Sequence, residues 1–282
     1  MQKKFNIKLN ALALEKTLYV LGAGAFGVFI RWLQRQSAFD DNGLVNSRSL
    51  WNVLVLAIIL AAFLVFRRFI KAFRKEGREL PEDAYTAFRA ENKAFGVFRI
   101  CLGGLMCVGA AVLFLTCETY IDVKFLKALA IAGFLSGLCF IQFNWHLRQE
   151  SDKTGAMCLC AVVPVLTLAL WLLTCYKMND INSVVWDYGV EIVTLCVAMF
   201  AAFYVAGFVF SYAAPWKTLF FNMFAAFLLL MCLADERNMG MQLMLLAQAG
   251  MFVYYNWVML ENIGDKKKKN IFAPADDGFD RL

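Results

Sequence analysis

The feature that most constrains this chain is a series of apolar runs, each long enough to cross a lipid bilayer. A helix needs about 20 mostly apolar residues to span the hydrocarbon core. Runs of this kind lie near residues 17–34, 50–66, 95–117, 125–145, 156–176, 191–214, 216–234 and 241–260. The sequence therefore predicts an all-α membrane protein with a single transmembrane domain, built as a bundle of eight helices.

Composition supports a membrane location. Hydrophobic residues make up 61% of the chain and charged residues 18%, whereas soluble domains have roughly 45–50% and about 25%. The first run contains Arg31, whose side chain we expect to reach toward the lipid headgroups. No other Asp, Glu, Lys or Arg stands well inside a run, and buried ionisable groups usually mark proton and ion pathways. The sequence therefore weighs against a proton-coupled pump.

Lysine and arginine are distributed unevenly among the segments between these runs. Nine of them lie between Arg67 and Arg99, mostly in the segment 67–94. Positive charge beside a membrane span stays on the cytoplasmic side. With the N-terminus inside, 21 of the 28 lysines and arginines are cytoplasmic. We therefore expect both termini in the cytoplasm, a cytoplasmic tail at 262–282, and a location in the cytoplasmic (plasma) membrane.

Two basic stretches on that side predict a contact with anionic lipid headgroups. Between Phe66 and Phe73, aromatic and aliphatic residues recur at helical spacing on one side, with basic residues around them. A basic helix of this kind tends to lie against anionic lipid. The alternative is a solvated linker whose charge only sets the topology. Pro81 and the acids after it predict a short helix ending near Lys93. The predicted lipid contacts are Arg67, Arg68, Lys71, Arg74, Lys75, Lys266, Lys267, Lys268 and Lys269.

Because the cations stand beside apolar runs, membrane topology explains the net charge of +6, and we expect no nucleic-acid partner. The run from Gly22 to Gly27 matches the dinucleotide pattern G-x-G-x-x-G. That pattern needs a preceding strand, and here it lies inside a span, where small residues allow helices to approach closely. We expect the same of Gly133 and Gly137.

Catalytic and metal-binding patterns are weak. Ser136 and the single histidine, His146, are ten residues apart, which is about 15 Å along one helix and too far for a catalytic pair. Cys158 and Cys160 point to different sides of a helix, so we predict no metal site and no cofactor. Most of the nine cysteines stand in apolar runs as small hydrophobes. A disulfide is conceivable among three near outer helix ends, Cys117, Cys175 and Cys232, but spacing cannot pair them.

Five uncharged polar residues are the candidate substrate site. They cluster toward the cytoplasmic half of the fourth, seventh and eighth runs, and Gln142 shares a helix face with His146 at i, i+4. They form either hydrogen bonds between helices or a substrate vestibule open to the cytoplasm. The five residues are Gln142, Asn144, His146, Asn222 and Asn256.

Two stretches near the start suggest a family resemblance: Phe29-Ile30-Arg31-Trp32-Leu33 and Asp41-Asn42-Gly43-Leu44-Val45, followed by the second apolar run. This opening resembles uncharacterised multi-pass membrane proteins of Gram-positive anaerobic bacteria. The likeness covers about the first fifth of the chain. It implies no activity and assigns no functional residue.

The leading functional expectation is the binding or passive transport of a small or lipid-like substrate. The alternative is a non-catalytic structural or regulatory membrane component that acts through partner contacts, and an enzyme ranks third. The two leading hypotheses predict different bundles. A transporter should contain a polar cavity that water can reach, whereas a scaffold should be packed solid and present an apolar groove at its side.

Overall fold

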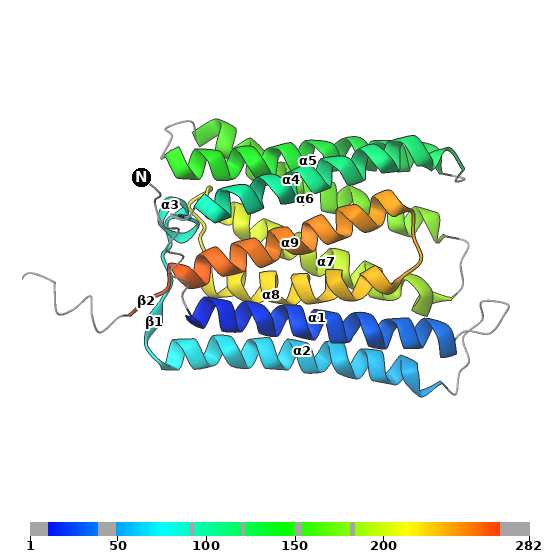
Figure 1. The fold of residues 1–282 in the computed structure, drawn as a ribbon, viewed down its shortest axis with the longest axis horizontal. Coiled ribbons are helices and arrows are strands. Elements are labelled where there is room, and N and C mark those ends of the chain that lie inside the picture. Colours follow the sequence, from blue (N-terminus) through cyan, green and yellow to red (C-terminus); the bar gives the residue numbers. More distant parts are fainter. Residues whose placement is uncertain are drawn as a thin grey trace, which may run out of the picture.

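The computed structural model describes residues 11–38, 49–90, 93–119, 122–149, 154–180 and 184–265. They form an elongated bundle of long, roughly antiparallel helices (Figure 1). The elements are α1 (Ala11–Ser37), α2 (Leu50–Lys75), β1 (Arg78–Glu79), α3 (Ala84–Ala87), α4 (Lys93–Thr116), η1 (Cys117–Thr119), α5 (Val123–Gln149), α6 (Thr154–Met178), α7 (Val185–Gly207), α8 (Pro215–Met231), η2 (Cys232–Ala234), α9 (Met239–Glu261) and β2 (Gly264–Asp265).

Among the described residues, eight helices are long and apolar enough to cross a membrane, which confirms the predicted fold class. The end of the bundle that carries β1, β2 and α3 is called the strand end, and the opposite end the far end (Figure 1). The threading prediction places the strand end in the cytoplasm. That orientation stays a prediction.

Two helix boundaries differ clearly from the predicted runs. Helix α1 extends beyond 17–34 at both ends. Helix α7 ends at Gly207 and not near residue 214. There the chain turns, with Ser211 at a φ of 58° and the Tyr212 amide donating to the Gly207 carbonyl at 2.8 Å. Pro215 then opens α8, a position that suits proline because its missing N–H needs no partner there.

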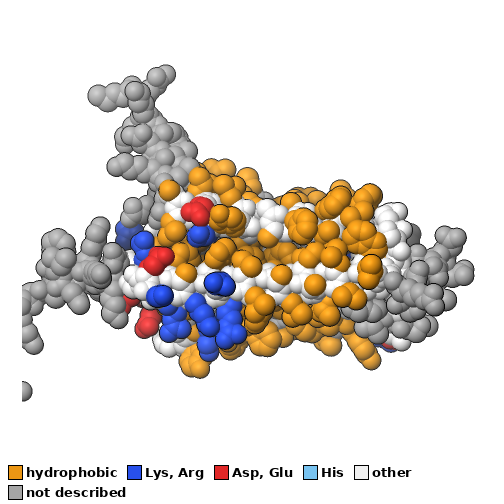
Figure 2. All heavy atoms as spheres, turned by 90° about the horizontal axis from the view of Figure 1, so that it is seen from below, with side chains coloured by type: hydrophobic (Ala, Val, Ile, Leu, Met, Phe, Trp, Pro, Cys, Tyr) orange, Lys and Arg blue, Asp and Glu red, His pale blue; other side chains and the backbone are white. Residues whose placement is uncertain are grey.

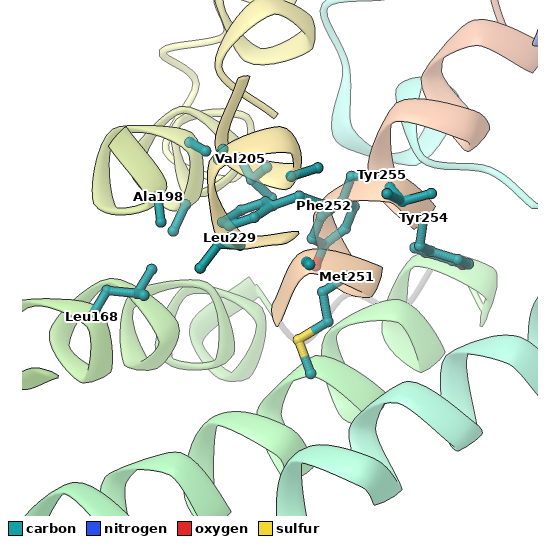
Figure 3. Packing of buried hydrophobic residues seen from close by; sticks show 14 of the residues in the cluster. Leu168, Ala198, Val205, Leu229, Met251, Phe252, Tyr254 and Tyr255 are labelled. Atoms are coloured by element: carbon teal, nitrogen blue, oxygen red, sulfur yellow. The ribbon is translucent and has the colours of Figure 1, made fainter. Parts of the chain in front are cut away.

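Burial ranks the helices from centre to edge. Helix α9 is the most buried of the eight spans and α2 the least. The closest neighbours of α9 are α4, α8 and α1. Side chains of α6, α7 and α8 meet those of α9 in the core, where Phe252 and Tyr255 are almost fully buried (Figure 3). A helix that is apolar all round belongs in such a centre.

Small residues bring two helix pairs into close contact, as predicted. A Cβ added at Gly27 would lie 3.2 Å from the Phe227 ring of α8, so α1 approaches α8 closely. A Cβ at Gly137 would lie 2.7 Å from the Gly103 carbonyl oxygen, so α5 crosses α4 with no room for a side chain. Close backbone approach of this kind is how helices associate inside lipid.

The segment after α2 folds onto the strand end of the bundle. Strand β1 pairs antiparallel with β2, and the Asp83 side chain caps α3 by accepting from the Thr86 amide at 3.0 Å. The Phe88 side chain is 2% exposed, with its ring centroid 4.9 Å from that of Phe208 and 5.2 Å from that of Tyr255. This part of the predicted segment 67–94 is therefore packed against the bundle and is not a solvated linker.

The short predicted helix also ends earlier than expected, at Ala87 and not near Lys93. The Asn262 side chain donates to the carbonyls of Ala87 and Arg89, at 3.1 and 2.9 Å. Because these carbonyls bond to a side chain after α9, the helix does not continue through them.

Candidate functional site

Four charged side chains meet at the far end of the bundle, and we call them the ionic cluster: Arg31, Glu191, Asp235 and Arg237. The Arg31 Nε donates to Asp235 Oδ1 at 2.7 Å. The Arg237 Nη2 contacts Asp235 Oδ2 at 2.8 Å and Glu191 Oε2 at 3.0 Å. Each of the four side chains is at most 9% exposed. Arg35 adds a longer contact, with its Nη1 3.8 Å from Asp235 Oδ1 and its side chain 23% exposed. Cations and carboxylates thus gather inside the protein.

Hydrogen bonds extend the ionic cluster to further helices. Arg31 donates to the Gln34 side chain, and Gln34 donates to Asn52 at the start of α2, both at 2.6 Å. Gln242 at the start of α9 donates to the Asp235 backbone carbonyl at 3.3 Å. The network therefore joins α1, α2, α7, α9 and the connection between η2 and α9.

The expectation that Arg31 reaches toward the headgroups is wrong. Its side chain is fully buried. The physical reason is that the η2–α9 connection brings the Asp235 carboxylate to the guanidinium, so the charge is compensated inside the protein. Burial is the largest single effect and disfavours the Arg237 cation, but the combined attraction of Glu191, Asp235 and other neighbours outweighs it, and the pKa of Arg237 is raised above its ordinary value. Arg237 therefore remains charged.

Thiols and an indole surround the Glu191 carboxyl. The Trp171 indole and the Cys175 thiol of α6 lie beside it. Cys232 contacts the Thr194 hydroxyl at 3.1 Å. Of the three cysteines considered for a disulfide, Cys117, Cys175 and Cys232, each is a buried free thiol in this structure.

In the described part of the chain, the arrangement pairs charges and places no histidine beside the two thiols. A neighbouring base such as histidine is one common way to activate a cysteine nucleophile. The single histidine, His146, lies near the C-terminus of α5 at the strand end, away from these thiols. Three buried atoms of the region have no hydrogen-bond partner in the described part of the chain: Trp171 Nε1, Glu191 Oε1 and Arg237 Nη1.

Sequence reasoning missed the ionic cluster because its members lie far apart in the chain. Arg31 and Asp235 are 204 residues apart. The one available signal was the combination of an arginine inside a span with an acid in a short connection on the same side of the membrane.

The structure places the five predicted substrate-site residues in different surroundings. Gln142 is exposed, whereas His146, four residues later, is buried. Asn144 donates to the Phe140 carbonyl of its own helix at 2.8 Å. Asn222 is fully buried, and neither atom of its amide has a partner among the described residues.

Asn256 joins two helices. With its amide oriented to satisfy both groups, it donates to the Leu219 carbonyl at 3.1 Å and accepts from the Met223 amide at 2.9 Å. It borders a crevice between α1, α8 and α9 that has no room for water. Asn144 borders a different hollow, of about 10 Å³, with Arg99 and Tyr254. The hollows at these two residues are separate, and a substrate-binding role for the five residues stays a prediction.

The lateral surface carries a groove between α4 and α5, which we call the α4–α5 groove. It encloses about 360 Å³ and its lining is almost entirely apolar. Small alanines and large side chains line it together: Ala110, Ala111, Phe114, Leu115, Ala130, Ile131, Phe134 and Leu135. By contrast, a hollow inside the bundle, bordered by Gln248 and Met251, encloses about 20 Å³, enough for a single water molecule.

The predicted lipid contacts divide into two groups. Arg67, Arg68, Lys71, Arg74 and Lys75 are all exposed on α2. Lysine and arginine side chains gather at one end of the face to which α2 belongs, next to a band of hydrophobic side chains (Figure 2). The second group, Lys266 to Lys269, lies outside the described residues.

Comparisons with known proteins add no further constraint. No family model matches the sequence, and neither a curated protein nor a solved structure matches it. The function is therefore inferred from the geometry of the eight-helix membrane bundle.

Proposed function

We propose that this multi-pass membrane protein is a non-catalytic structural or regulatory component of the cytoplasmic membrane that acts by lateral contact with a partner helix. The observation that carries the proposal is the α4–α5 groove of about 360 Å³, the one large apolar hollow among those described above. The two interior hollows described above, of about 20 and 10 Å³, are water-sized. This is the pattern expected of a scaffold and not of a transporter.

Both ends of the bundle support this proposal. At the far end, the ionic cluster joins α1, α7 and the η2–α9 connection through contacts of 2.7 to 3.0 Å. At the strand end, Phe88 packs between Phe208 and Tyr255. The charged side chains of the ionic cluster bond to one another and do not line a pathway for a solute. A polar solute would have to separate both sets of contacts in order to cross.

The composition of the groove favours a helix as its occupant. Helices associate in lipid through van der Waals packing at small residues that allow close backbone approach. Ala110, Ala111 and Ala130 supply such positions, and larger residues such as Phe114 and Phe134 stand beside them. A partner helix with bulky apolar side chains would fill the space between these walls.

A lipid acyl chain is the second candidate occupant, because nearly all of the groove surface is apolar. It would make the protein a lipid-binding component, in line with the expectation of a lipid-like substrate. The two occupants predict different crosslinked products.

Photo-crosslinking in cells separates them. A photoreactive amino acid at Leu115 or Ile131, which line the groove and are 77% and 55% exposed, should give a discrete protein adduct of constant mass. Leu166 and Leu173 of α6, 61% and 60% exposed, are matched controls and should give lipid adducts only. The replacement Ala111→Trp should fill the groove and abolish the protein adduct. Lipid adducts alone at all four positions would overturn the partner-helix proposal and favour the acyl chain.

A further inference from the structure

The basic residues near the C-terminus of α2 form a patch on one face of the helix. When successive residues are placed about 100° apart around the helix, its five cations fall within a sector of about 120° and extend over about 12 Å of its length. All five are exposed: Arg67, Arg68, Lys71, Arg74 and Lys75. Phe66, Ile70 and Phe73 are 2%, 8% and 3% exposed and occupy the opposite side.

The same face is apolar along the rest of the helix. Val53, Leu56, Leu60 and Leu64 fall in the same angular sector as the cations, and they are 66%, 47%, 55% and 60% exposed. One continuous stripe of α2 is therefore apolar over most of the membrane-spanning part and basic beyond it. A phospholipid molecule has the same order of groups, acyl chains followed by phosphate.

The basic part lies at the right depth for a headgroup. Arg67 is about 26 Å from Leu50 along the helix axis. The hydrocarbon core of a bilayer is about 30 Å thick. The first cations therefore stand at the boundary between hydrocarbon and headgroups, and Lys75 lies about 12 Å further out.

Among the described residues, no acid pairs with the patch. In the described part of the chain none of its five cations forms an ion pair, and the nearby Glu76 contacts Arg78 at 3.7 Å instead. The helix under the patch is fixed by aromatic contacts, with the Phe66 ring centroid 6.2 Å from that of Phe227 on α8. The guanidinium and ammonium groups therefore stand on a helix that packs against α8, and none of them pairs with an acid in the described part of the chain.

We propose that this stripe of α2 is a binding site for anionic phospholipid. The acyl chains lie along Leu56, Leu60 and Leu64. One phosphate contacts Arg67, Arg68 and Lys71. Because Arg74 and Lys75 remain for another phosphate, the site prefers a lipid that carries two phosphates in one molecule. Juxtamembrane clusters of lysine and arginine attract anionic lipid in general. The continuous stripe adds an apolar surface against which the acyl chains pack.

The test uses the full-length protein in nanodiscs of phosphatidylcholine with either cardiolipin or phosphatidylglycerol at equal total charge. After transfer to detergent and gel filtration, mass spectrometry counts the lipids retained per protein. The wild type should retain cardiolipin several-fold above its share of the bilayer, and more of it than phosphatidylglycerol. The variant R67Q/R68Q/K71Q should lose the enrichment. The variant R74Q/K75Q should lose only the preference for the two-phosphate lipid.

A matched control removes three cations at the other end of the bundle, K124Q/K127Q/K177Q, and should behave as the wild type. The charge-conserving variant R67K/R68K should retain the enrichment, which separates loss of charge from loss of fold. Equal enrichment in R67Q/R68Q/K71Q and the control would overturn the proposal. The proposal would also be overturned if the wild type showed no enrichment or retained both lipids equally. Displacement of the lipid by millimolar inorganic phosphate would overturn it as well, because it would indicate a site for soluble anions.

Discussion

The two ends of the bundle use arginine in opposite ways. At the far end Arg31 is fully buried and bonds to Asp235 at 2.7 Å. At the strand end, Arg67 and Arg68 are exposed. The difference lies in what stands near each guanidinium: the Asp235 carboxylate beside Arg31 and, in our proposal, a lipid phosphate beside Arg67 and Arg68. It follows that the ionic cluster should control stability and the basic stripe should control lipid contact.

The comparison depends first on the two ends facing opposite sides of the membrane. In a cysteine-depleted background, Asp180→Cys at the far end and Glu76→Cys near the strand end place single exposed thiols on the two sides. A membrane-impermeant thiol reagent applied to intact cells should label Asp180→Cys and leave Glu76→Cys unlabelled until the cells are broken. Labelling of Glu76→Cys in intact cells would reverse the threading and remove the basis for a cytoplasmic lipid site.

The largest energetic effect is expected at Asp235. The replacement Asp235→Ala leaves Arg31 and Arg237 buried with too little negative charge, and breaking a buried pair in this way costs about 3–5 kcal/mol. Chemical denaturation in detergent measures the change in the free energy of unfolding. The matched control is Glu118→Ala, which breaks an exposed ion pair with Lys127 at the same end. Exposed pairs contribute roughly 0–1 kcal/mol, so the control should lose little stability.

Sequence patterns predicted the eight spans because each carries its own signal of length and hydropathy. They also predicted the continuation of α2 past the membrane, since Phe66, Ile70 and Phe73 recur at helical spacing and are indeed buried. The basic stripe could be read for the same reason, because all of its residues lie on one helix.

The ionic cluster could not be predicted, because its contacts join residues far apart in the sequence. The pairing of Arg31 with Asp235 depends on how α1 docks against the η2–α9 connection, and no periodicity within either segment reports that docking. The surroundings of Gln142 and His146 depend on the docking of helices in the same way. Their i, i+4 spacing is correct, but the position of neighbouring helices leaves Gln142 exposed and buries His146.

A smaller effect is expected at the strand end, where Asn256 bonds to the backbone of α8. Hydrogen bonds between helices in a membrane contribute about 0.6 kcal/mol on average, because separated helices also find partners. The replacement Asn256→Leu should lower the free energy of unfolding by about that amount. A loss comparable to that of Asp235→Ala would show that the uncharged polar groups matter as much as the ionic cluster, and the contrast between the two ends would fail.

A double-mutant cycle on Arg31 and Asp235 tests the central contrast most directly. The free energy of unfolding is measured for the wild type, Arg31→Ala, Asp235→Ala and the double variant, with the exposed pair Glu76 and Arg78 as the reference cycle. Residues in direct contact couple by about 0.5–3 kcal/mol, and a buried charge pair should lie in the upper part of that range. The account predicts a coupling of about 2 kcal/mol or more for Arg31 and Asp235, and a coupling near zero for the reference pair. Equal couplings in the two cycles would contradict it.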